Sequence, residues 1–228
     1  MIIFRNIVSI IFFVVLAYLS TCFQKSYVKN EKFKIKNIFP EEILYFVFCL
    51  FWYVSILIVG ILSYQKKEMT FLEMTEIMFL WCGMYLVSWT DFKIRKIPNI
   101  ILKILFIAKI IGILFQIIID HQEWKIAILS AGLGLLIAGG SVLLCRVFSK
   151  GQIGAGDIKL YALTGFYLNT VGFVNVMLYS VLIAGIFSII ILLVNKIKNK
   201  MKFSSAMKST IPMAPFIFLG TNLYLIFL

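Results

Sequence analysis

Charged residues are scarce in this chain of 228 residues, at 14%, whereas soluble domains typically carry about a quarter. Hydrophobic residues make up 62% of the chain, and the mean hydropathy is +1.01. This number of charges is too small to cover the surface of a soluble globular protein or to keep a chain disordered. Lipid is therefore expected to be the main solvent. The net charge of +12 would otherwise suggest nucleic acid, but this composition excludes a soluble nucleic-acid-binding domain.

Histidine and paired cysteines are lacking as well. His121 is the single histidine, and Cys22, Cys49, Cys82 and Cys145 are spread singly, with no CxxC pair. Because zinc sites need clusters of such ligands, no metal site is expected. The cysteines lie in or at the end of apolar stretches, where they are predicted to behave as small hydrophobic side chains.

Long apolar runs are abundant. A bilayer core about 30 Å thick needs roughly 20 apolar residues per helix. The runs predict an all-α, polytopic integral membrane protein with about eight transmembrane helices, forming one domain over residues 1–228 without a soluble part. Only a short polar stretch separates the sixth and seventh runs, so a tight turn is expected there. The predicted spans are 7–23, 43–64, 71–90, 104–119, 126–145, 157–168, 173–194 and 211–227.

Basic residues gather in alternate connections between these spans. Four segments, 24–42, 91–103, 146–159 and 195–210, hold 17 of the 22 lysines and arginines. The positive-inside rule therefore predicts that these segments face the cytoplasm from the cytoplasmic (inner) membrane, with both termini outside.

The N-terminus allows a second interpretation. Arg5, an apolar run and residues 19–22 (Leu-Ser-Thr-Cys) loosely resemble a lipoprotein signal. Threonine before the cysteine fits poorly, and five lysines follow that would have to cross the membrane. The first run is therefore assigned as a span.

Ionisable residues at membrane depth are the first candidates for function, because burying them is costly. Most of those in this chain are expected to be solvated or interfacial, with Lys109 extending its ammonium group toward the boundary. This group comprises Glu73, Glu76, Lys109, Asp120, His121 and Glu123.

Asp91 and Asp157 differ from that group, because the predicted topology places both at the cytoplasmic boundary. Glycines precede Asp157, and Pro98 interrupts the helix that follows Asp91. Two carboxyl groups at one depth suit aspartic hydrolysis, in which the pair shares one proton and activates a water molecule. Their spacing alone also allows two separately solvated carboxylates.

Three motifs carrying these residues resemble the type IV prepilin peptidases. Residues 154–160 (GAGDIKL) resemble the GxGD signature of that family, Asp91 with residues 97–99 (IPN) resembles its other aspartate element, and residues 211–216 (IPMAPF) resemble the run that opens its last helix. The resemblance implies a membrane aspartyl endopeptidase that cleaves leaders from prepilins or pseudopilins, with Asp91 and Asp157 catalytic. The positions implied as motif or positioning residues are Pro98, Asn99, Gly154, Gly156, Lys159, Pro212 and Pro215.

The chain departs from the bifunctional members of that family at segment 24–42. Those members carry two zinc-binding CxxC pairs there and methylate the new amino terminus with S-adenosylmethionine. The short lysine-rich segment has no cysteine. We therefore expect no cofactor for peptidase activity, and S-adenosylmethionine only if methyltransferase activity is retained.

The expected partners are prepilin or pseudopilin substrates and membrane lipids, not nucleic acid. The lysines are expected to fix topology and hold lipid headgroups, because a basic leader would be repelled by them. Alternatives are a preflagellin peptidase or another GxGD protease, and a small transporter that uses Asp91 and Asp157 as ion-coupling carboxylates. No internal repeat of the kind common in transporters is present, and a scaffold protein would give the glycine-flanked aspartate no purpose.

Overall fold

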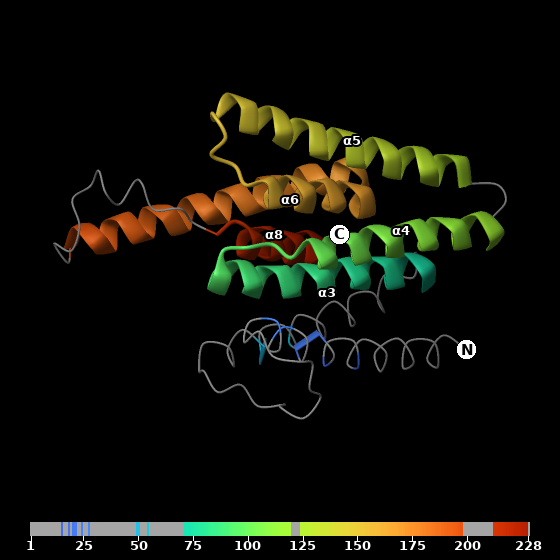
Figure 1. The fold of residues 1–228 in the computed structure, drawn as a ribbon, viewed down its shortest axis with the longest axis horizontal. Helices are drawn as coiled ribbons and strands as arrows, with labels where there is room; N and C mark the ends of the chain where they lie inside the picture. The colour runs from blue at the N-terminus through green and yellow to red at the C-terminus, as the bar shows by residue number, and fades with distance from the viewer. Residues whose placement is uncertain are drawn as a thin grey trace.

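The computed structural model describes residues 71–119, 124–197 and 212–227, together with a few positions before them: 15, 18, 20, 21, 24, 27, 49, 50 and 54. These three continuous stretches contain five helices. Their bounds are α3 (Phe71–Ile94), α4 (Asn99–Ile119), α5 (Trp124–Phe148), α6 (Ala155–Ile197) and α8 (Ala214–Phe227). The helices run roughly along one common axis, and α8 lies between α6 and α3 (Figure 1).

The helix α6 is a hairpin of two antiparallel arms, 155–168 and 170–197. Asn169 breaks it with φ of 59° and ψ of −176°, a conformation that residues other than glycine adopt only under strain. The Tyr161 hydroxyl lies 2.7 Å from the Ser180 hydroxyl, and the Tyr161 ring packs edge-on against Phe173. Residues 19 apart in a straight helix would be almost 30 Å apart, so the chain reverses at Asn169. The expected tight turn is confirmed.

The predicted number of about eight spans is not confirmed. Within the described residues, three helices are long and apolar enough to cross a membrane: α4, α5 and α6. Helix α8 has 14 residues and the first arm of α6 is similarly short, whereas a crossing needs roughly 20. Spans 7–23 and 43–64 lie almost wholly outside the described residues.

The end of the first predicted span, drawn from hydropathy at residue 23, was misplaced. Gln24 and Tyr27, expected in the basic connection 24–42, are helical. Gln24 is fully buried, and its amide donates to the carbonyl oxygens of Tyr85 and Leu86 at 3.3 and 3.5 Å. Because a buried amide with hydrogen-bond partners can remain inside a helix bundle, polarity alone is a poor guide to where a helix ends.

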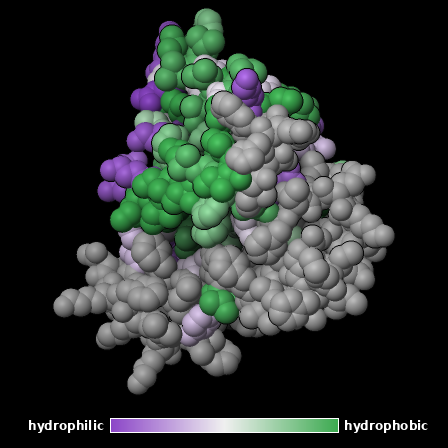
Figure 2. All heavy atoms as spheres, turned by 90° about the vertical axis from the view of Figure 1, so that its right-hand side faces the viewer, coloured by the Kyte–Doolittle hydropathy of each residue, from purple (hydrophilic) through white to green (hydrophobic). Residues whose placement is uncertain are grey.

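The outer surface of α4, α5 and α6 is apolar. Side chains such as Ile118, Leu129, Leu136 and Ile189 are more than half exposed. Hydrophobic side chains cover much of the face that these helices present in Figure 2. An apolar surface of this extent on a helical bundle is typical of contact with lipid, so the fold supports a membrane protein.

Helices α5 and α6 approach closely at two glycines that face each other. A Cβ atom on Gly134 would overlap the carbonyl oxygen of Gly165, and one on Gly165 would overlap that of Gly134. Small residues allow such backbone contact, which supplies much of the attraction between helices in lipid. This contact holds the first arm of α6 against α5.

Gly134→Ala is expected to destabilise the protein by about 1–3 kcal/mol, because the methyl group must displace backbone rather than a flexible side chain. Gly132→Ala is the matched control, since a Cβ atom at Gly132 meets nothing within 4 Å. Thermal denaturation in detergent micelles measures the difference. Equal melting temperatures for the two variants would contradict the close helix contact.

Candidate active site

Asp91 lies near the C-terminal end of α3 and is 7% exposed. Its Oδ2 atom accepts a hydrogen bond of 3.1 Å from the backbone N–H of Ala214, the first residue of α8. A helix N-terminus carries partial positive charge, and Arg95 also attracts the carboxylate. The position of Asp91 is therefore fixed from α8 as well as from its own helix.

Asp157 lies in the first turn of α6 and is half-buried. The backbone of Gly154 donates a hydrogen bond to its carboxylate, and its charge interacts directly with that of Asp91. The charge of Asp91 acts on Asp157, 66 positions further along the sequence, so the end of α3 lies near enough to the start of α6 for the two carboxyl groups to interact.

Gly154 and Gly156 each make room for a particular neighbour. A Cβ atom on Gly154 would come within 2.8 Å of the Asp157 carboxylate, and one on Gly156 would come within 3.0–3.3 Å of the Ile97 side chain. The first glycine leaves space for the carboxylate and the second lets the linker between α3 and α4 lie against α6. Both contacts explain why small residues occur at these positions.

That linker carries the next two motif residues. The carbonyl of Pro98, which is buried, accepts the N–H groups of Ile101 and Leu102 at 3.2 and 3.5 Å and so begins α4. Asn99 follows at the exposed start of the helix, where its Oδ1 atom accepts a 3.0 Å hydrogen bond from the Lys159 ammonium group. This bond connects the linker after Asp91 to the helix that carries Asp157.

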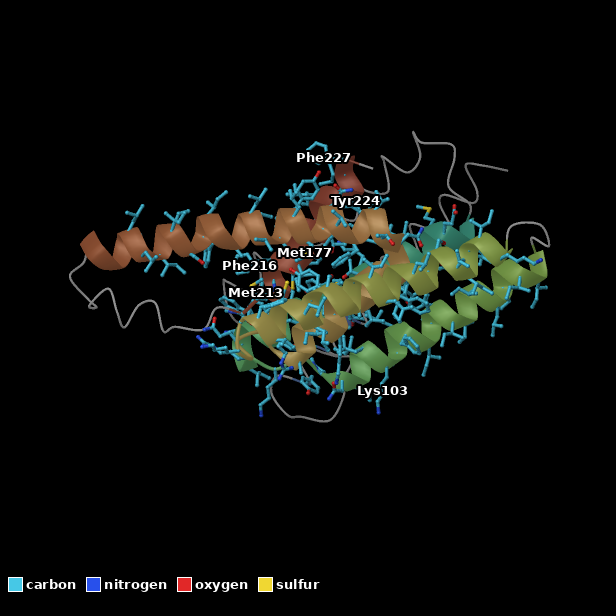
Figure 3. All side chains as sticks on the ribbon, turned by 90° about the horizontal axis from the view of Figure 1, so that it is seen from above. Lys103, Met177, Met213, Phe216, Tyr224 and Phe227 are labelled. Carbon is cyan, nitrogen blue, oxygen red and sulfur yellow. The ribbon has the colours of Figure 1, made fainter. Side chains whose placement is uncertain are left out.

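The start of α8 is formed by the third motif. Pro212 and Met213 precede the helix, and the carbonyl of Met213 accepts the N–H groups of Phe216 and Ile217. Pro215 is in the first turn, where its missing N–H leaves no intrahelical bond unmade. Figure 3 shows Met213 and Phe216 beside the second arm of α6, and the rings of Phe216 and Phe187 lie 5.4 Å apart.

The Ala214 backbone N–H is the group that sequence reasoning missed. It is a main-chain donor within the IPMAPF run, and side-chain chemistry gives no sign of it. The only signal was the pair of prolines, Pro212 and Pro215, whose nitrogens cannot donate, which leaves the N–H groups of Met213 and Ala214 between them as main-chain donors.

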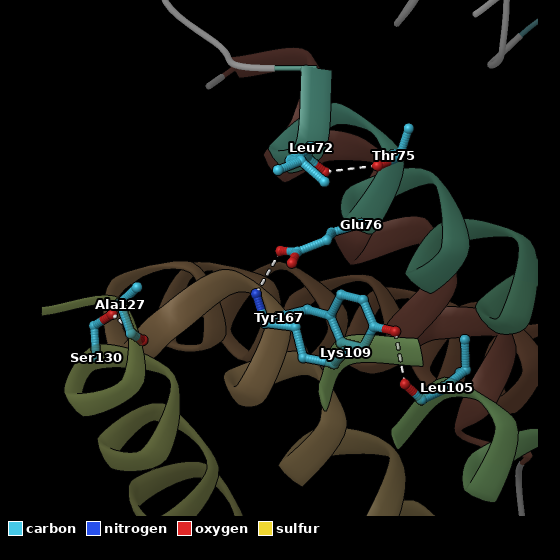
Figure 4. Close-up of polar contacts among 8 residues, drawn as sticks. All are labelled: Leu72, Thr75, Glu76, Leu105, Lys109, Ala127, Ser130 and Tyr167. Carbon is cyan, nitrogen blue, oxygen red and sulfur yellow. Dashed lines mark hydrogen bonds and ion pairs between the residues drawn. The ribbon is translucent and has the colours of Figure 1, made fainter. Parts of the chain in front are cut away.

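Glu76 and Lys109 were wrongly expected at the membrane boundary. They form a buried ion pair at 2.6 Å between α3 and α4, with side chains 9% and 7% exposed (Figure 4). Lys109 also lies over the Tyr167 ring, 5.5 Å from its centroid, and the Tyr167 hydroxyl donates to the Leu105 carbonyl. The error arose because α4 begins at Asn99, five residues before the predicted span, which places Lys109 about 15 Å along the helix.

The remaining charged candidates are divided between exposed and undescribed positions. Glu73 is exposed, as expected. Asp120, His121 and Glu123 lie outside the described residues. Within the described part of the chain, no three His, Cys, Asp or Glu side chains gather as a metal site would need; the expectation about metals stays a prediction.

The fold and the site define a helical membrane protein in which two carboxyl groups interact where three helix ends meet. Residues 77–189 match the type IV leader peptidase family, and this match supports assigning the chain to that family. The matched region includes Asp91 and Asp157, whereas α8 lies beyond it. Comparisons with curated proteins and with solved structures gave no match.

Lys109→Met is expected to lower stability by about 3–5 kcal/mol, because it leaves the Glu76 carboxylate buried without its partner. The double variant Glu76→Gln with Lys109→Met removes both charges and should recover most of that loss. Thermal denaturation of both variants in the same detergent tests the pair. A double variant no more stable than the single one would contradict the buried ion pair.

Proposed function

We propose that the protein is an aspartyl endopeptidase that removes the leader from type IV prepilins or pseudopilins at the cytoplasmic membrane boundary. The observation that carries this proposal is the interaction of the Asp91 and Asp157 carboxyl groups, within a region that matches a leader peptidase family. A pair of carboxyl groups is sufficient for peptide hydrolysis by acid–base chemistry, so no cofactor is proposed for cleavage.

The two carboxyl groups share one proton, because like charges at short range resist ionising together. The ionised member takes a proton from water as the water oxygen attacks the scissile carbonyl carbon. The protonated member donates a hydrogen bond to the carbonyl oxygen. Proton transfer to the leaving nitrogen then breaks the C–N bond and frees the new amino terminus.

Asp91 is the better candidate for the ionised member. It receives the Ala214 N–H from the start of α8 and is attracted by Arg95, and each favours negative charge there. Asp157 faces that negative charge from the start of α6 and is the better candidate for the proton carrier. Both carboxyl groups lie at ends of helices, where a peptide bond just outside the membrane could reach them.

The cytoplasmic location follows from the distribution of basic residues. The segments next to both aspartates, 91–103 and 146–159, belong to the basic set. A leader on the cytoplasmic side of a hydrophobic pilin segment would place its junction at the same level. An ion-coupling role in a transporter is less well supported, because the aspartates lie at helix ends and not at mid-membrane depth.

Asp91→Asn and Asp157→Asn should each lower the rate of prepilin processing roughly 100-fold to 10,000-fold, which is the range that general acid–base catalysis contributes. These variants keep the shape of the side chain, so the membrane level of the protein should be unchanged. Glu73→Gln, on the exposed other end of α3, is the control and should process normally. Rapid cleavage by either asparagine variant would rule out the two-carboxylate mechanism.

Processing by the intact protein should show a bell-shaped pH dependence, since one carboxyl group must be ionised and the other protonated. On the acid side activity falls as both groups become protonated, and on the alkaline side it falls as both become ionised. Initial cleavage rates of a synthetic prepilin peptide in detergent, measured across pH, test this. A rate that rises to a plateau without falling again would contradict the shared proton.

Addition of labelled S-adenosylmethionine to the cleaved product distinguishes a simple peptidase from one that also methylates. The expected result is an unmethylated product, because segment 24–42 departs from the bifunctional members.

A further inference from the structure

A groove of about 600 Å³ lies between α4, α5 and the first arm of α6, apart from the two aspartates. Its volume falls within the roughly 300–1,000 Å³ common for sites that hold small ligands. Phe106 and Ile107 of α4 and Leu135 of α5 line its length. Because Phe106 and Ile107 are 42% and 55% exposed, the groove opens onto the lipid-facing surface and not into the core.

One end of the groove is basic. Lys103, Lys159 and Asn99 line it there, at the starts of α4 and α6. Lys159 uses one N–H on Asn99, and neither lysine forms an ion pair within the described residues. Figure 3 shows the Lys103 side chain reaching out beyond the helices near the start of α4. Two ammonium groups without a carboxylate therefore stand at the mouth of an apolar groove.

We infer that this groove binds one anionic phospholipid, with its phosphate between Lys103 and Lys159 and an acyl chain along Phe106, Ile107 and Leu135. A phospholipid has this combination of an anionic head and an apolar tail, and it is present at high concentration on this surface. Each lysine near an anionic headgroup contributes attraction, whereas the helix faces below contribute only apolar contact. The site goes beyond the proposed peptidase activity and does not require it.

The hydrophobic segment of a substrate is the competing occupant. The charge at the groove argues against it, since the basic leader expected of a prepilin would meet the same two lysines and be repelled. The lipid's phosphate is instead attracted by them. The two occupants therefore differ in the sign of their interaction with Lys103 and Lys159.

The test uses the full-length protein, purified in mild detergent and supplied with equal amounts of phosphatidylglycerol and phosphatidylcholine. Intact-protein mass spectrometry then counts the lipids that stay bound. The wild-type protein should retain one phosphatidylglycerol in preference to phosphatidylcholine. Lys103→Gln should lower that preference roughly fivefold, which is the share of one lysine near an anionic headgroup.

Matched variants distinguish binding in the groove from nonspecific attraction to lysines and from nonspecific contact of lipid with the apolar surface. Lys150→Gln removes an exposed lysine outside the groove and should leave the preference unchanged. Ile107→Trp should fill the groove and release the lipid, while Ile111→Trp, one turn further along α4 and 47% exposed, should not. If Ile107→Trp does not fold, the lipid preferences of Lys103→Gln and Lys150→Gln still test whether the groove binds the lipid.

Three results would overturn the inference. These are equal retention of the two lipids by the wild-type protein, equal effects of Lys103→Gln and Lys150→Gln, and one-for-one displacement of the bound lipid by a synthetic prepilin peptide. The last would assign the groove to substrate. Because the readout is bound lipid and not cleavage, an inactive protease would leave it unaffected.

Discussion

The hydrogen bond from the Ala214 N–H to Asp91 joins parts of the chain that are 123 positions apart. Asp91 is buried, and a buried carboxylate without partners would be costly. Helix α8 satisfies that need because the N–H groups of its first turn have no partners within the helix. The start of α8 must therefore sit at the end of α3, and the short linker to α4 and the glycine-lined start of α6 are arranged around the same point.

Two charged pairs in this bundle illustrate opposite uses of a low-dielectric interior. Glu76 and Lys109 attract each other across α3 and α4, so the fold holds them together and neither is available for chemistry. Asp91 and Asp157 would repel each other if both were ionised, and each accepts a backbone hydrogen bond that favours its charged form. A protein retains a repulsive arrangement of this kind when function requires it, and the energy comes from packing elsewhere.

The sequence was sufficient for the class of fold, the helical segments from residue 71 onward and the turn near Asn169, because apolar runs and their interruptions are local properties. The two aspartates could be singled out from charge, glycine and proline patterns. Three features could not. The Ala214 contact is made by the main chain, the Lys159–Asn99 bond depends on how two helix starts face each other, and the Glu76–Lys109 pair depends on where α4 begins. Each is set by tertiary packing that hydropathy does not encode.

The hairpin form of α6 has a consequence for the depth of Asp157. Helices that cross a bilayer adjust their tilt to its thickness, and residues at their ends move with that tilt. The first arm of α6 is too short to span, and it is held by Tyr161 against Ser180 and by Gly165 against α5. The depth of this arm in the bilayer is therefore set by contacts with other helices of the protein. The distance between the two aspartates should then stay the same when the thickness of the membrane changes.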